Sequence, residues 1–373
     1  MGFGLFVPEF RSEFGMSTST IGAVSSLGFF GFFLGLLLAQ ALLTRSGPKL
    51  PVLAGLVAAT VGMGIVSQAP NVIVLALGVF IAASSAGLAW TPFNDAVHRK
   101  VTEPDRPTAL SVISTGTGLG IVFAGIAALA MVMGGLSWRA SWTFFAGASA
   151  LALLGNWLAL RRVEKAPDDR HGNGWRDLLH IRSLPIFVIG FVFGTTTAIY
   201  ISFAADHMVT AGGVAGFRIG ATPALVFIGY GLFGLAGLLT GRIKAIIGLS
   251  ALLRLLMLAG ALSVMLVAFA PGTWAGLILS AGLQGVYLMM ISAILAFWSE
   301  RLFPELPSLS FTAALLAAAA GNVLGPAIAG VLSDTLGAEA MFLLASVPPL
   351  ATALLLRDRH AQEQPAHAAQ MRQ

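Results

Sequence analysis

Two residues that could pass a proton are adjacent in an otherwise apolar stretch of this chain. Asp206 and His207 follow directly on the apolar segment 184–205. A carboxylate beside an imidazole could relay protons, because histidine titrates near neutral pH. The alternative is a solvated helix end. Glu9, which follows Pro8, has the same two interpretations: an outer gate or a solvated helix end.

Other charged residues lie at or within the apolar segments. Asp95 and Glu300 are 205 residues apart, and each is at the end of an apolar segment. They could pair with Arg99 and Arg301, or they could be solvated at the lipid headgroups. Arg254 is inside a segment, where it could snorkel to the headgroups or bind an anion in a transport path. We find no metal-spaced histidines, phosphate loop or nucleophile motif, so we expect no enzyme activity, metal or cofactor.

Glycines recur at one spacing in two apolar segments that are 205 residues apart. The two sets are Gly116, Gly120 and Gly125, and Gly321, Gly325 and Gly330. Small residues on one face let membrane helices approach closely. The repeat predicts a duplicated helical bundle, which is typical of secondary transporters. The glycine faces could provide static packing, or a contact along which two halves move.

The composition requires lipid as the solvent. Of the 373 residues, 57% are hydrophobic and only 10% are charged. A soluble protein of this length needs more charge to cover its surface. The net charge of +5 does not indicate nucleic-acid binding, because the basic residues lie in short loops. Cysteine is absent, which excludes a disulfide framework and a thiolate metal site.

Eleven stretches are apolar over the roughly 20 residues that a helix needs to cross a bilayer. They are 20–41, 50–68, 72–93, 108–133, 138–160, 184–205, 221–241, 245–269, 273–298, 309–332 and 336–356. Each is predicted to be a helix, because backbone groups inside lipid must bond to one another. Residues 1–10 cover half a bilayer, and we interpret them as the outer half of a first span. Residue 1 is then an internal position of a longer protein; a short re-entrant or peripheral segment is the alternative.

The loops predict the orientation and the division of the chain. Lysine and arginine number 17 on one side of the membrane and 3 on the other, and the richer side is expected to be cytoplasmic. Residues 161–183 form a polar, charged stretch that we interpret as a cytoplasmic linker. It separates an N-terminal bundle, 1–160, from a C-terminal bundle, 184–356. Residues 357–373 are expected to be a cytoplasmic tail.

A loop motif carries a resemblance to a known family. The stretch Gln40-x3-Thr44-Arg45-Ser46-Gly47-Pro48-Lys49 follows the pattern Gly-x3-Asp-Arg-x-Gly-x-Arg/Lys of the major facilitator superfamily. Gly237-x3-Gly241-Arg242 repeats part of it. With the spans and the linker, the whole chain resembles this superfamily, and its motif-poor pattern is similar to efflux-like branches. The family's aspartate is associated with charge contacts on the cytoplasmic side, and Thr44 and Gly241 replace it here.

The resemblance implies a fold and a set of candidate residues. The fold is an all-α membrane bundle of six plus six spans, with eleven full spans and a partial first. Pore-facing residues in this family are commonest in spans one, four, seven and ten. The candidate cavity residues are Ser84, Trp90, Asn94, Thr196, Tyr200, Gln284, Tyr287 and Asn322. The candidate coupling or gating residues are Glu9, Asp95, Asp206, His207, Glu300, Arg45 and Arg242.

These observations predict a secondary transporter of the bacterial cytoplasmic membrane that works by alternating access. Amide and aromatic cavity residues indicate a neutral or weakly polar, partly apolar solute, although each could instead bond to a neighbouring helix. Proton coupling is an option. The alternative is a non-transporting receptor or scaffold, favoured by the degraded loop motifs and the scarcity of intramembrane carboxylates. We expect a monomer in lipid that does not bind nucleic acid.

Overall fold

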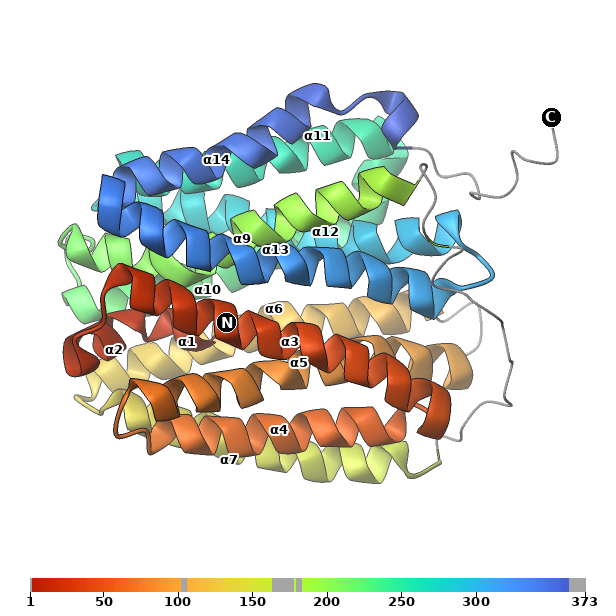
Figure 1. The fold of residues 1–373 in the computed structure, drawn as a ribbon, viewed down its shortest axis with the longest axis horizontal. Coiled ribbons are helices and arrows are strands. Elements are labelled where there is room, and N and C mark those ends of the chain that lie inside the picture. The colour runs from red at the N-terminus through yellow and green to blue at the C-terminus, as the bar shows by residue number, and fades with distance from the viewer. Residues whose placement is uncertain (1, 102–105, 163–177, 179–182, 362–373) are drawn as a thin grey trace.

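The computed structural model of the chain is a bundle of roughly parallel and antiparallel helices (Figure 1). It describes residues 2–101, 106–162, 178 and 183–361, and every regular element in those ranges is helical. The candidate linker falls largely outside the described residues, as does the end of the tail. We call the end of the bundle at which α2 lies, on the left of Figure 1, the outer end, and the opposite end the inner end.

The helices follow the predicted apolar stretches closely. Before the linker they are α1 (Gly2–Leu5), α2 (Val7–Phe14), α3 (Thr18–Ser46), α4 (Lys49–Ser67), α5 (Val72–Lys100), α6 (Arg106–Met133) and α7 (Trp138–Ala159). After it they are α9 (Leu184–Thr210), α10 (Thr222–Gly234), α11 (Thr240–Phe269), α12 (Trp274–Leu302), α13 (Pro307–Leu336) and α14 (Ala338–Leu355). Short 3₁₀ turns are η1 (Leu160–Arg162), η3 (Ile219–Ala221), η4 (Leu235–Leu239) and η5 (Asp358–His360).

Ten helical stretches within the described residues are long and apolar enough to cross a membrane. One of them, Ile219–Phe269, has 51 residues and contains two of the predicted spans. The break between these spans is at Gly248, whose φ of 80° and ψ of 164° are not helical. Glycine adopts a positive φ without the steric cost that a Cβ would add. The sequence had set this boundary a few residues earlier, at 242–244.

Helix starts at the outer end are fixed by side-chain caps. Ser17 accepts a hydrogen bond from the Thr20 amide at the start of α3, and Asn71 accepts one from the Val74 amide at the start of α5. Such caps satisfy backbone donors that a first turn leaves unpaired. Large apolar side chains point away from the bundle, among them Ile73, Ile246 and Leu354, and they form the surface expected to face lipid.

The repeat in the glycine spacing extends to the packing of the helices. Before the linker, α3 packs on α5, α4 on α5 and α4 on α7; after it, α10 packs on α12, α11 on α12 and α11 on α14. An offset of 205 residues maps the first set of helices onto the second. Two further contacts, α3 with α13 and α6 with α10, join helices from opposite sides of the linker. In Figure 1, α3 and α13 run alongside each other through the middle of the bundle.

Candidate gating and transport site

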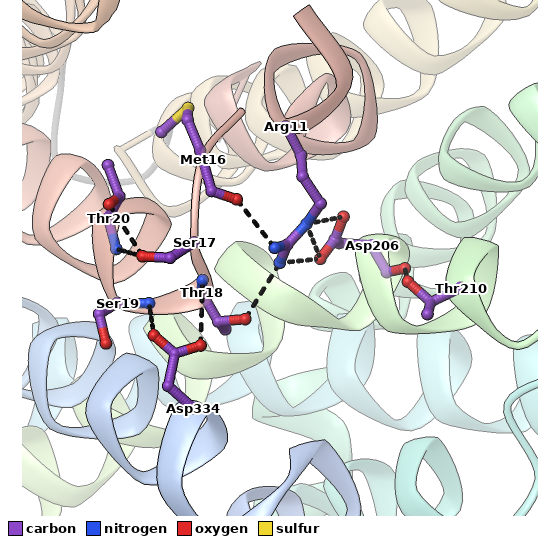
Figure 2. A network of polar contacts seen from close by, with 9 residues as sticks. All are labelled: Arg11, Met16, Ser17, Thr18, Ser19, Thr20, Asp206, Thr210 and Asp334. Carbon is purple, nitrogen blue, oxygen red and sulfur yellow. Dashed lines mark hydrogen bonds and ion pairs between the residues drawn. The ribbon is translucent and has the colours of Figure 1, made fainter. Parts of the chain in front are cut away.

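An ion pair joins the two sets of helices at the outer end (Figure 2). The guanidinium of Arg11, on α2, donates to both carboxylate oxygens of Asp206, on α9, with N–O distances of 2.7 to 3.1 Å. The side chain of Asp206 is 9% exposed and that of Arg11 is 32% exposed. A two-pronged contact of this kind fixes geometry as well as adding electrostatic energy. The sequence singled out Asp206 as a candidate but gave Arg11 no role in gating.

The same guanidinium also holds the turn between α2 and α3. Arg11 Nη1 donates to the carbonyl of Met16 at 3.0 Å, and Nη2 donates to the Thr18 hydroxyl at 3.2 Å. The chain can turn here because α2 is followed by Gly15, which has a left-handed φ of 62°. Arg11 therefore connects α9 to the beginning of α3.

A second carboxylate from the C-terminal helices reaches the start of α3. Asp334, near the end of α13, accepts hydrogen bonds from the backbone amides of Thr18 at 3.2 Å and Ser19 at 2.8 Å (Figure 2). Next to this contact, the backbones of α3 and α13 touch each other directly at glycines. Gly22 lies against the carbonyl of Pro326, and a Cβ added to Gly330 would be 2.8 Å from the Thr18 carbonyl oxygen. We call Arg11, Thr18, Ser19, Asp206 and Asp334 together the outer contact.

Glu9 and His207 are close to this ion pair but do not belong to it. Glu9 Oε2 and His207 Nε2 are buried and have no hydrogen-bond partner among the described residues. The charge of Asp206 acts on both side chains, and the His207 ring lies 5.4 Å from that of Phe342. A pocket of about 220 Å³ adjoins the group, and Arg11, Asp206 and His207 are among the residues that line it.

Four of the predicted cavity residues are packed inside the C-terminal helices. Gln284 is fully buried; its Oε1 accepts from the Ser263 hydroxyl at 2.9 Å, and its Nε2 is 3.4 Å from the Thr197 hydroxyl. Tyr200 and Ser280 hydroxyl oxygens are 3.2 Å apart.

The other two candidates of this group are also fully buried. Tyr287 packs on Gly260, with its hydroxyl 3.7 Å from the Met257 sulfur, while Thr196 donates to the Val192 carbonyl. Gln284, Tyr287, Tyr200 and Thr196 thus bond within their own set of helices, and a solute cannot reach them in this conformation.

The remaining cavity candidates are more accessible. Ser84, Trp90 and Asn94 on α5 and Asn322 on α13 are each half-buried. The Ser84 hydroxyl donates to the carbonyl of Ile81 at 2.7 Å. Trp90 packs against an apolar cluster that spans α3 and α13. These four side chains therefore remain candidates for contact with a solute.

At the inner end, neutral side chains of α3 and α5 meet α13 within the part of the chain that the structure describes. The Thr312 hydroxyl of α13 is 3.1 Å from Gln40 Oε1 of α3 and 3.5 Å from the Thr91 hydroxyl of α5. Beside them Leu36 packs with three buried side chains of α13. We call Gln40, Thr91 and Thr312 the inner contact. The sequence did not identify it, because hydroxyl and amide residues are common in helices.

The charged residues predicted to gate the inner end lie mostly outside this contact. Arg45, Arg242 and Glu300 are exposed. Asp95 is half-buried and makes a polar interaction, but the Arg99 side chain proposed as its partner lies outside the described residues. The Thr44 hydroxyl, which replaces the aspartate of the family motif, is within hydrogen-bond distance of two carbonyls of its own helix.

The glycine faces form close contacts, but not at every predicted position. Gly321 and Gly325 lie against α9, whereas Gly330 lies against α3. A Cβ added to Gly125 would be 2.8 Å from Ile228 on α10.

Two glycines of α6 do not follow the prediction. Around Gly116 and Gly120 no described atom comes within 4 Å of an added Cβ, so the expected packing role is wrong for this pair. Gly118 makes the contact instead, opposite Gly231 of α10. Gly118 and Gly125 are two helical turns apart and lie on one face of α6, whereas Gly116 and Gly120 lie on the opposite face.

Comparisons with known proteins agree with this architecture. The family model of the Major Facilitator Superfamily matches residues 1–243. The chain is similar in structure to the nucleoside transporter NupG, with 14% sequence identity, a TM-score of 0.74 and 95% of both chains covered.

Two further solved structures show the same similarity. One is a POT family transporter in complex with a thioalcohol-conjugated peptide (14% identity, TM-score 0.75, covering 95% of this chain and 91% of that one). The other is a bacterial homologue of the lysosomal transporter Spinster (16%, 0.71, 95% and 91%). No curated protein matches the chain by sequence.

A duplicated bundle of membrane-crossing helices, matched by this family model over more than half its length, defines a polytopic transport protein. The chain belongs to the Major Facilitator Superfamily, as the loop motif and spans predicted, and it is a secondary active transporter. Nothing in the comparisons favours the alternative of a receptor or scaffold.

Proposed function

We propose that the chain carries a small, neutral or weakly polar solute across the bacterial cytoplasmic membrane by alternating access. The moving units are 1–160 and 184–356, with 161–183 as a cytoplasmic linker and 357–373 as a cytoplasmic tail. The observation that carries the proposal is the ion pair of Arg11 and Asp206, which joins the two units at the outer end. Access from the outer side requires this pair to separate.

The half-buried side chains suggest where the solute is held. Trp90 and Asn94 on α5 and Asn322 on α13 offer one indole ring and two amides on helices that contact each other across the units. Aromatic faces bury apolar parts of a ligand, while amides fix its orientation by hydrogen bonds. This set suits an uncharged solute with a flat or apolar part. Nucleosides and peptides, the solutes named for similar structures, are the first probes to test.

We further propose that protons drive the transport through the carboxylates of the outer end. Glu9 and Asp206 act on each other electrostatically, and one buried oxygen of Glu9 has no partner among the described residues. A proton on Asp206 would remove the charge that holds Arg11, and Glu9 is a neighbouring group that could exchange it. His207, on the next residue, adds an imidazole that titrates near neutral pH in water.

Transport in liposomes tests both parts of this proposal. At least one nucleoside or peptide should raise the apparent unfolding temperature of the purified protein by mass action, and that solute should then cross the membrane of proteoliposomes. A protonophore should abolish accumulation but not equilibration. In Asp206→Asn, accumulation should be lost while slow equilibration continues. Accumulation that persists with a protonophore would exclude proton coupling, and solute binding without flux would favour a receptor.

A further inference from the structure

We propose that Asp334 is a gating residue of the transporter, whose carboxylate holds the first turn of α3 and keeps the outer end closed. This inference rests on the alternating access proposed above. It concerns a residue that the sequence did not single out. The residues that carry it are the two amides that Asp334 binds and the glycines that bring α13 against α3.

The backbone amides at the start of α3 donate to acceptors from two places, the residue before α3 itself and α13. The Ser17 hydroxyl caps α3 from within and accepts the Thr20 amide at 3.1 Å. The amides of Thr18 and Ser19 precede the regular ladder of the helix and need other acceptors. Asp334 supplies both. A carboxylate is favourable here because the N-terminus of a helix carries a partial positive charge. The cap of α3 is thus completed by a residue from the opposite unit.

The position of Asp334 on α13 explains why it can reach these amides. Gly330, one turn earlier, allows the backbone of α3 to come close at Thr18 and Ser19. Thr18 lies between the two carboxylates: its amide donates to Asp334 and its hydroxyl accepts from Arg11. Two acidic residues of the C-terminal unit therefore hold one corner of the N-terminal unit, as Figure 2 shows.

The strength of this contact suits a gate that must open. Asp334 is exposed to solvent, so water can replace it on the two amides when the helices part. Exposed charged contacts are weak and are screened by salt. The inner contact of Thr312, Gln40 and Thr91 carries no charge. A loss of charge at position 334 should therefore shift the protein toward opening at the outer end.

The absence of cysteine allows a direct test by thiol labelling. Ser26→Cys places a reporter one turn below Gly22 on α3, at a buried residue whose hydroxyl has no partner among the described residues. A membrane-impermeant maleimide added from outside should label this cysteine slowly. In Asp334→Ala labelling should be about fivefold faster, the shift expected for loss of a helix cap, and in Asp334→Asn the increase should be smaller.

The matched control is Thr335→Ala, on the next residue of α13. Thr335 is exposed, and its hydroxyl is within hydrogen-bond distance of two carbonyls of its own helix. In Thr335→Ala the reporter cysteine at position 26 should be labelled at the same rate as in the parent, which carries Ser26→Cys alone. Labelling of the parent should also rise with external salt, and in Asp334→Ala this dependence should be smaller. A purely structural role would not change the salt dependence, and unfolding temperatures identify any variant that fails to fold.

The outcomes separate this inference from the function on which it rests. Asp206→Ala serves as the reference variant that opens the outer contact. If Asp206→Ala speeds labelling while Asp334→Ala does not, Asp334 is not a gating residue, although alternating access stands. If the reporter responds to neither variant nor to any solute, alternating access at this end fails, and the inference fails with it.

Discussion

Arg11 is central to the outer contact, because its guanidinium bonds both to Asp206 on α9 and to the turn before α3. Removing its partner with Asp206→Ala leaves a part-buried guanidinium without a counter-charge. We expect the free energy of unfolding to fall by about 1–3 kcal/mol, less than for a fully buried pair because Arg11 is one-third exposed. Thermal unfolding in detergent measures this change.

The control is an ion pair that stays within one unit. Glu13 accepts from Arg139 at 2.6 Å, with side-chain exposures of 39% and 35%. Arg139→Gln removes this charge without touching the outer contact, and it should cost less than about 1 kcal/mol. It should also leave Ser26→Cys labelling unchanged. A larger effect in Arg139→Gln than in Asp206→Ala would contradict the importance given to Arg11.

The sequence identified some residues of the site and missed others for physical reasons. Asp206, His207 and Glu9 could be named because ionisable groups near lipid are costly. Arg11 and Asp334 could not be assigned roles, because their partners are 195 and 316 residues away in the chain. Polar helix ends are common in membrane proteins, so a carboxylate that caps another helix looks like any other until the helices are placed.

At the scale of the helix, spacing predicted that glycines would form faces but not which neighbour each face would meet. In α13, Gly321 and Gly325 are one turn apart and share a face toward α9. Gly330 is rotated by more than a quarter turn from them and meets α3. The spans were predicted well because each needs a long apolar run. The break at Gly248 was misplaced, since a single glycine within an apolar run gives no sign of its φ.

The contact of α6 with α10 provides a test at this scale. A Cβ on Gly231 would be 2.7 Å from the Gly118 carbonyl oxygen, so Gly231→Ala should force the helices apart and cost about 1–3 kcal/mol. Gly120→Ala, in the open part of α6, should be neutral or stabilise the protein by up to about 1 kcal/mol through helix propensity. Thermal unfolding of the two variants compares them directly, and equal destabilisation would show that Gly120 has a neighbour after all.

At the scale of the whole bundle, the outer contact and the inner contact differ in charge among the residues that the structure describes. The outer contact combines one arginine with two carboxylates, whereas the inner contact consists of hydroxyl and amide groups beside an apolar cluster. Charged contacts respond to salt and protons, and neutral ones do not. Salt and protons should therefore control the transport cycle at the outer end. The inner end should respond indirectly, because the closed outer end and the closed inner end are competing states of one equilibrium.

That competition predicts opposite effects of variants at the two ends. Thr312→Val keeps the size of a fully buried side chain but removes the hydroxyl that meets Gln40 and Thr91. We expect a loss of about 1 kcal/mol, or about fivefold, in the closure of the inner end. In inverted vesicles a cysteine at Ala319, buried in the neighbouring apolar cluster, should be labelled faster in Thr312→Val.

The same variant should slow labelling of Ser26→Cys from outside, because opening of one end disfavours opening of the other. Combining Thr312→Val with Asp334→Ala should return the outer labelling rate close to that of the parent, since the two free-energy changes then oppose each other in one equilibrium. If the double variant is instead labelled faster at both ends, the two contacts loosen independently of each other. The units would then not alternate as one body, and the outer and inner contacts would be separate gates.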